Sequence, residues 1–174
     1  MLKRWRYRIW QGLTRLRADL RPHAIDLEPA RRQLSGEAWG LFGALSSGDQ
    51  EHAIGVFRLI QQQSGGSDAL ADAALLHDVG KLGAGLNLGW RALIVILGAL
   101  GLVERAASRD PNSWRHPLYL HLHHAERGAE MCANAGCSPE VVALVRWHDA
   151  TPGSIPDETI RIDLAILRAA DDAC

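Results

Sequence analysis

The sequence has few cysteines, no long apolar run and no alternating strand pattern, and each absence narrows the class of protein. Three cysteines in 174 residues are an odd number, and Cys132 and Cys137 are too far apart for a Cys-x-x-Cys pair. We therefore expect ordinary thiols in a reducing cytosol rather than a disulfide framework or a cysteine zinc site. No segment alternates apolar and polar residues as a half-buried strand does, so an all-α fold is predicted.

Apolar stretches are too short or too often interrupted to cross a membrane. Residues 92–103 are almost wholly apolar, but a bilayer needs about 20 such residues, so we expect a buried helix or a flap there. Arginines interrupt the apolar residues at the N-terminus, and no signal peptide is predicted. A chain of 174 residues with 47% hydrophobic residues can bury one core. A cytoplasmic protein with one main domain is the expectation.

Positive charge is scarce beyond the first 22 residues. That segment holds seven basic side chains and one acid, whereas the remainder has 12 basic and 19 acidic residues, a net charge of −7. Nucleic acids require a large basic face, which an acidic body lacks, so no nucleic-acid partner is expected.

Residues 1–22 are predicted to form a basic amphipathic helix. One face is apolar, with residues at steps of three and four: Leu2, Trp5, Ile9, Leu13, Leu16 and Leu20. Such a helix can pack on the domain or on a second subunit with its arginines solvated, or lie on an anionic membrane surface. Both alternatives stay open, and the second would give a peripheral membrane contact. Arg21-Pro22 ends the helix, so residues 23–174 form the main domain.

Capping signals divide the main domain into further helices. A second helix is predicted over about 28–45, and Ser47-Gly-Asp-Gln50 resembles a capping box that starts the next one. Ser67 can cap a helix that ends near residue 77, and Ser138-Pro139 can start a short helix that ends near residue 148. Asp157 opens a final helix.

The most informative stretch is Ala-Ala-Leu-Leu-His77-Asp78-Val-Gly-Lys81. Neither His nor Asp favours a buried helix end unless something compensates for its desolvation. A divalent metal would do so, and an imidazole beside a carboxylate points to Fe, Mn, Zn, Co or Mg. The alternative is a histidine at a helix C-terminus beside a solvated aspartate.

Four more residues share this setting, at or near helix ends with apolar neighbours. His52 lies 25 positions before His77, His124 lies 46 after Asp78, His148 follows at a further 24, and Asp171 at a further 23. Their contexts include Glu-His-Ala-Ile-Gly-Val-Phe, Leu-Leu-His-Asp-Val-Gly-Lys, His-Ala-Glu-Arg-Gly-Ala-Glu, Val-Arg-Trp-His-Asp and Leu-Arg-Ala-Ala-Asp-Asp. In this order and context the chain resembles the HD-domain family of metal-dependent phosphohydrolases, over roughly residues 47–174.

The resemblance implies an HD-type helical bundle and a site for one or two divalent ions. The ligands of the first ion would be His52, His77, Asp78 and Asp171. Those of the second would be His124 and His148, with Asp78 bridging the two ions and Lys81 contacting a phosphate oxygen. Arg127 could also contact phosphate, or be a surface residue.

The chain departs from the family pattern at a few points. Asp149 stands where some members have a second histidine, which puts a third histidine ligand on that ion in doubt. One register step would exchange Asp171 for Asp172. Members that cleave cyclic dinucleotides often carry a Gly-Tyr-Pro element, and its absence here weakens that substrate.

The expected function is hydrolysis of a phosphomonoester or phosphodiester, with a nucleotide as the substrate class and Asp78 and Lys81 in catalytic roles. The alternative is a non-catalytic HD-like domain used for sensing or docking at a membrane surface. Such domains usually lose metal ligands, whereas this chain keeps all six positions.

Overall fold

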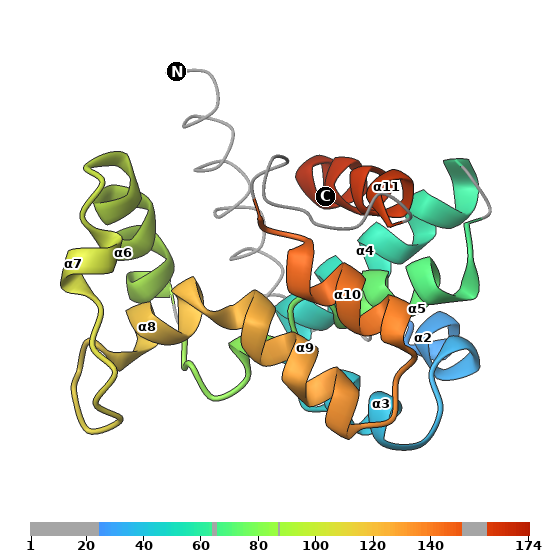
Figure 1. Ribbon diagram of the computed structural model, residues 1–174, viewed down its shortest axis with the longest axis horizontal. Coiled ribbons are helices and arrows are strands. Elements are labelled where there is room, and N and C mark those ends of the chain that lie inside the picture. Colours follow the sequence, from blue (N-terminus) through green and yellow to red (C-terminus); the bar gives the residue numbers. More distant parts are fainter. Residues whose placement is uncertain (1–24, 64–65, 87, 151–159) are drawn as a thin grey trace. The chain divides into compact units, whose positions relative to one another are not determined.

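The computed structural model describes residues 25–63, 66–86, 88–150 and 160–174 (Figure 1). Within these ranges the chain forms ten α-helices and one short 3-10 turn, and none of the described residues lies in a strand. The predicted all-α fold is confirmed. The predicted helix over residues 1–22 and the predicted helix start at Asp157 lie outside the described residues. No described helix is long and apolar enough to span a membrane.

The described residues form two compact units. The larger comprises residues 25–80 and 124–174, and the smaller comprises residues 81–123. The helices of the larger unit are α2 (Glu28–Gln33), α3 (Gly36–Gly43), α4 (Ser47–Gln63), α5 (Asp68–Leu76), α9 (His124–Asn134), α10 (Pro139–Trp147) and α11 (Arg161–Ala173). The 3-10 turn η1 (Val79–Lys81) follows α5 and ends at the first residue of the smaller unit.

Helix α5 lies at the centre of the larger unit, in contact with α2, α3, α4, α10 and α11. Its sequence explains this position, because six of its nine residues are buried alanines and leucines, and its polar side consists of Asp68 and Asp72, four positions apart. Small alanine side chains let neighbouring helices approach closely. Ser67 accepts a hydrogen bond from the Leu70 amide at 3.1 Å and starts the helix, as predicted. Because α5 is central, His77 and Asp78 at its C-terminal end are buried in the core.

The smaller unit contains α6 (Leu88–Ala99), α7 (Val103–Ala106) and α8 (His116–Leu122), and α7 contacts both other helices. The indole rings of Trp90 and Trp114 stack with centroids 6.0 Å apart. The expectation of a buried helix here is wrong, since none of the described side chains of α6 is buried.

Two local predictions also need correction. The helix predicted over 28–45 is broken into α2 and α3, where Leu34 and Ser35 are extended and Gly36 adopts a φ of +55°. The cap of α4 is Ser46 rather than Ser47: its hydroxyl accepts from the Asp49 amide at 3.2 Å. The Ser46 hydroxyl also donates to the Asp49 carboxylate at 2.7 Å.

Candidate metal centre

The larger unit brings all six predicted ligands into one cluster, from the ends or first turns of five helices. His52 lies on α4, His77 caps the C-terminus of α5 and Asp78 follows it, His124 begins α9, His148 caps the C-terminus of α10, and Asp171 lies in the last turn of α11.

One part of the cluster gathers around His77. Ligand atoms of His52, His77 and Asp78 all lie within 4.8 Å of one another. His77 Nε2 is 3.6 Å from Asp78 Oδ2 and 3.7 Å from Asp171 Oδ1, and His52 Nε2 is 2.8 Å from the same Asp171 oxygen. Two donors that each sit about 2.1 Å from one ion are about 3.0–3.5 Å apart. These side chains therefore need only small movements to bind a single cation.

The other part of the cluster gathers around His124 and His148. Their Nε2 atoms are 3.1 Å apart, and Asp78 Oδ1 lies 3.7 Å from the first and 4.0 Å from the second. Ligand atoms of these three residues also lie within 4.8 Å of one another. Asp78 thus turns Oδ2 toward one histidine group and Oδ1 toward the other.

The cluster is deeply buried except at one side. His52, His77, Asp78, His124 and His148 are all buried, whereas the Asp171 side chain is 35% exposed. Burying these five polar side chains costs folding free energy unless a cation binds them, because burial removes the water that would solvate them. Solvent or a ligand can therefore reach the cluster at the exposed part of the Asp171 side chain.

Two backbone carbonyls fix the orientation of the central rings. His77 Nδ1 lies 2.9 Å from the Ala74 oxygen and His148 Nδ1 lies 2.7 Å from the Val145 oxygen. Each carbonyl can only accept, so each Nδ1 carries the proton and each Nε2 presents a lone pair to the cluster. This is how metal-binding histidines are commonly held.

The clearest sign of a missing partner is at His77. Among the described residues, its Nε2 is the only buried side-chain nitrogen or oxygen with no hydrogen-bond partner. A buried lone pair without a partner costs stability, so native proteins rarely retain one. A cation would supply the partner, and the buried His and Asp groups could hold one.

The acidity of Asp171 suits the same role. Burial alone would raise the pKa of its carboxyl, but the hydrogen bond from His52 and the nearby His77 ring bring the pKa below its ordinary value. Asp171 is therefore ionised at neutral pH. A proton lies between His52 Nε2 and Asp171 Oδ1, and a cation bound by both residues would displace it. Asp172, the alternative by one register step, is exposed.

One supporting residue, Arg168, had no clear signal in the sequence. The Arg168 guanidinium donates to the carbonyls of Trp147 at 2.5 Å and His148 at 2.8 Å, and also to that of Ala150. It thereby satisfies the C-terminal carbonyls of α10 and holds His148 in place. A basic residue 20 positions away in sequence cannot be assigned to this helix end without the fold.

Gly80 and Arg127 join η1 to α9. A Cβ atom added at Gly80 would lie 1.8 Å from the His124 oxygen, so only glycine permits this approach. Arg127 donates to the Gly80 carbonyl at 2.6 Å. Arg127 therefore has a structural contact, in addition to the two roles considered from the sequence.

Lys81 ends η1, three residues after Asp78, but belongs to the smaller unit. Its predicted contact with phosphate stays a prediction. Asp149, where some HD domains have a histidine, is exposed.

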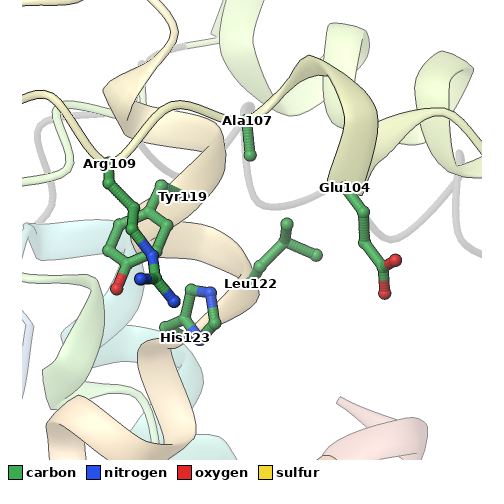
Figure 2. A pocket seen from close by; sticks show the side chains of 6 residues that line it. All are labelled: Glu104, Ala107, Arg109, Tyr119, Leu122 and His123. Carbon is green, nitrogen blue, oxygen red and sulfur yellow. The ribbon is translucent and has the colours of Figure 1, made fainter.

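The smaller unit contains a separate pocket of about 320 Å³ (Figure 2). Its lining residues are Glu104, Ala107, Arg109, Tyr119, Leu122 and His123. The Arg109 guanidinium lies 5.8 Å from the centroid of the Tyr119 ring, and the rings of Tyr119 and His123 are 4.3 Å apart. In Figure 2 the guanidinium points toward His123, while Glu104 is turned away.

Comparison with known proteins gives no family model, no curated protein and no solved structure that matches this chain. The buried His and Asp cluster in an all-α fold is compatible with an HD domain. The local geometry of the larger unit is therefore the basis for any statement about function.

Proposed function

We propose that the protein is a metal-dependent phosphohydrolase that cleaves a phosphomonoester or phosphodiester, with a nucleotide as the substrate class. The observation that supports it most is the position of Asp78, whose two oxygens face two different histidine groups within a buried cluster. A carboxylate between two groups of histidines is suited to hold a pair of divalent ions.

The donor set indicates which ions fit. One group offers two imidazoles and two carboxylates, and the other offers two imidazoles and the shared Asp78. Imidazole favours Fe, Co or Zn and carboxylate suits Mn, whereas Mg prefers oxygen ligands throughout and retains several waters. The unpartnered Nε2 of His77 supports the same choice, because a transition metal satisfies an imidazole nitrogen well.

A bound pair of ions would activate water at neutral pH and neutralise charge on a phosphoryl group. The protein's own part is positioning. Carbonyls of Ala74 and Val145 hold the rings of His77 and His148, and the ionised Asp171 lies at the exposed side where substrate would enter. Lys81 would contact a phosphate oxygen, as the family resemblance implies, and so offset substrate charge.

Elemental analysis of protein purified anaerobically, without a chelator or a metal-binding tag, is the test. Two equivalents of Fe, Mn, Co or Zn per chain, with turnover of a nucleotide in a phosphoester screen, would support the proposal. Asp171→Ala should lower both metal content and turnover, whereas its exposed neighbour Asp172→Ala should lower neither.

The proposal fails if no metal binds after reconstitution, or if Asp78→Ala and Asp171→Ala leave metal content and hydrolysis unchanged. Metal without turnover of any phosphoester would favour the alternative of a non-catalytic sensing or docking domain. That alternative has one observation of its own, the exposed apolar surface of α6.

A further inference from the structure

Helix α6 of the smaller unit has an apolar surface where a soluble helix would have a polar one. Ala92, Ile96 and Leu100 follow one another at steps of four along the helix and its end, and all three are exposed. The exposed fraction is 56% for Ile96 and 64% for Leu100, and Leu102 just beyond is 36% exposed. A helix that is apolar on its exposed side needs a covering that the described residues 81–123 do not provide.

Charge is divided between the parts of the chain in an uneven way. Residues 81–123 carry five basic and two acidic side chains, a net charge of +3, and residues 1–22 carry seven and one. Residues 24–80 and 124–174 carry seven basic and 17 acidic side chains, a net charge of −10. Three arginines of the smaller unit, Arg105, Arg109 and Arg115, are exposed. The apolar helix therefore belongs to a positively charged unit of an acidic protein.

Two surfaces could cover the apolar side of α6, namely a second copy of the chain and a lipid membrane. The positive charge of the smaller unit favours the membrane. A second copy joined by a two-fold axis would place the positive unit against itself, which like-charge repulsion opposes. An anionic lipid surface complements it, because each basic residue near such a surface contributes attraction. Trp114, 70% exposed and stacked on Trp90, is also typical of a membrane interface.

We propose that the smaller unit docks on an anionic membrane surface through the apolar side of α6. Ile96, Leu100 and Leu102 enter the boundary between headgroups and acyl chains, and the exposed arginines contact lipid phosphates. The twelve residues of α6 are about 18 Å long, too short to cross a bilayer, so the helix lies in the plane of the interface. This inference does not depend on the proposed function, because no ligand of the candidate metal centre lies in the smaller unit.

The test is sedimentation of the full-length protein with vesicles of phosphatidylcholine alone or mixed with phosphatidylglycerol. We expect binding to the mixed vesicles that weakens as salt is raised. The double variant Ile96→Glu, Leu100→Glu should bind at least about tenfold less, since it replaces two apolar contacts by charges. Ile162→Glu is the matched control: Ile162 is 73% exposed on α11 of the larger unit, and this variant should bind like the wild type.

Each other outcome overturns the proposal. Equal binding of the double variant and the wild type would place any membrane contact elsewhere, for example in residues 1–22. Failure of the wild type to bind mixed vesicles would exclude the lipid surface as the covering. A concentration-dependent dimer that only the double variant loses would identify a second copy instead. Circular dichroism and metal content of each variant establish that it is folded.

Discussion

His77 shows how a single buried nitrogen can indicate a ligand. Its Nδ1 is satisfied by the Ala74 carbonyl, and its Nε2 has no hydrogen-bond partner among the described residues. The sequence predicted that His77 and Asp78 end a helix and suggested a metal. It could not show that the ring is fully buried with one nitrogen unsatisfied, because that depends on α4, α10 and α11 closing around it.

We predict that His77→Leu separates metal binding from folding. Without metal, the free energy of unfolding of the variant should differ from that of the wild type by about 1 kcal/mol or less. The reason is that loss of the Nδ1 hydrogen bond is balanced by removal of the unsatisfied Nε2 atom. With metal, the wild type should be stabilised more than the variant, which keeps only the group around His124 and His148. Melting temperatures measured with added metal and with chelator test this. An equal rise in both proteins would show that metal binds elsewhere.

Gly80→Ala should be strongly destabilising. The added methyl would lie 1.8 Å from the His124 oxygen, so η1 and α9 would have to separate, at a cost of about 3 kcal/mol or more. The control is Gly40→Ala within α3, where nothing lies within 4 Å and alanine should stabilise the helix by about 0.5–1 kcal/mol. Urea denaturation measures both. Similar midpoints for the two variants would contradict the close approach at Gly80.

Helices that begin with a clear cap were predictable, and those shaped by distant contacts were not. Ser138 accepts from the Val141 amide and starts α10, as expected, and Gly136 before it has a φ of +76°. The break between α2 and α3 was missed: Leu34 and Ser35 are extended there, Gly36 has a φ of +55°, and the Leu34 side chain is buried. The same applies to Arg168, whose partners lie about 20 positions earlier.

Arg168 links α11 to the end of α10, and its loss should loosen His148. Arg168→Met keeps the length of the side chain but removes donors to three carbonyls, so we expect a loss of about 1.5–3 kcal/mol in stability. Metal content should fall toward one equivalent, because only the group around His124 and His148 is disturbed. Arg161→Met, exposed on the same helix, is the control. Equal effects of the two variants on metal content would argue against a positioning role.

For the whole molecule, the all-α class followed from the absence of strand patterns, but the division into two units did not. Residues 92–103 show why, since their composition predicted burial and the structure leaves them partly exposed. An apolar segment is buried in most soluble proteins because water is its only other surrounding. That assumption fails where another apolar surface, such as a membrane, is available.

Global stability should fall at alkaline pH because of Cys132. Burial, followed by the nearby Cys137, raises the pKa of the Cys132 thiol from 9.0 to about 12 in the folded protein. The stability that the buried, protonated Cys132 thiol contributes to the folded state is fully present below pH 9.0. It is lost as the pH rises toward 12, because between these two values the thiol ionises in the unfolded protein but not in the folded protein. In this range the free energy of unfolding should fall by up to about 1.4 kcal/mol per pH unit because of this one group.

Cys132→Ala should flatten this pH dependence, and Cys174→Ala should leave it as in the wild type. Urea denaturation at a series of pH values above 8 measures the slope, and iodoacetamide should label Cys132 only after unfolding. Identical slopes in wild type and Cys132→Ala would assign the alkaline loss of stability to other groups.

The contact between His52 and Asp171 joins residues 119 positions apart. An ion held by both, as proposed, would close a loop of that length and act on the chain much as a cross-link does. The ion would then oppose the separation of α11 from α4. Amide hydrogen exchange in these two helices, measured with added metal and with chelator, would show how far the ion slows the opening of the larger unit.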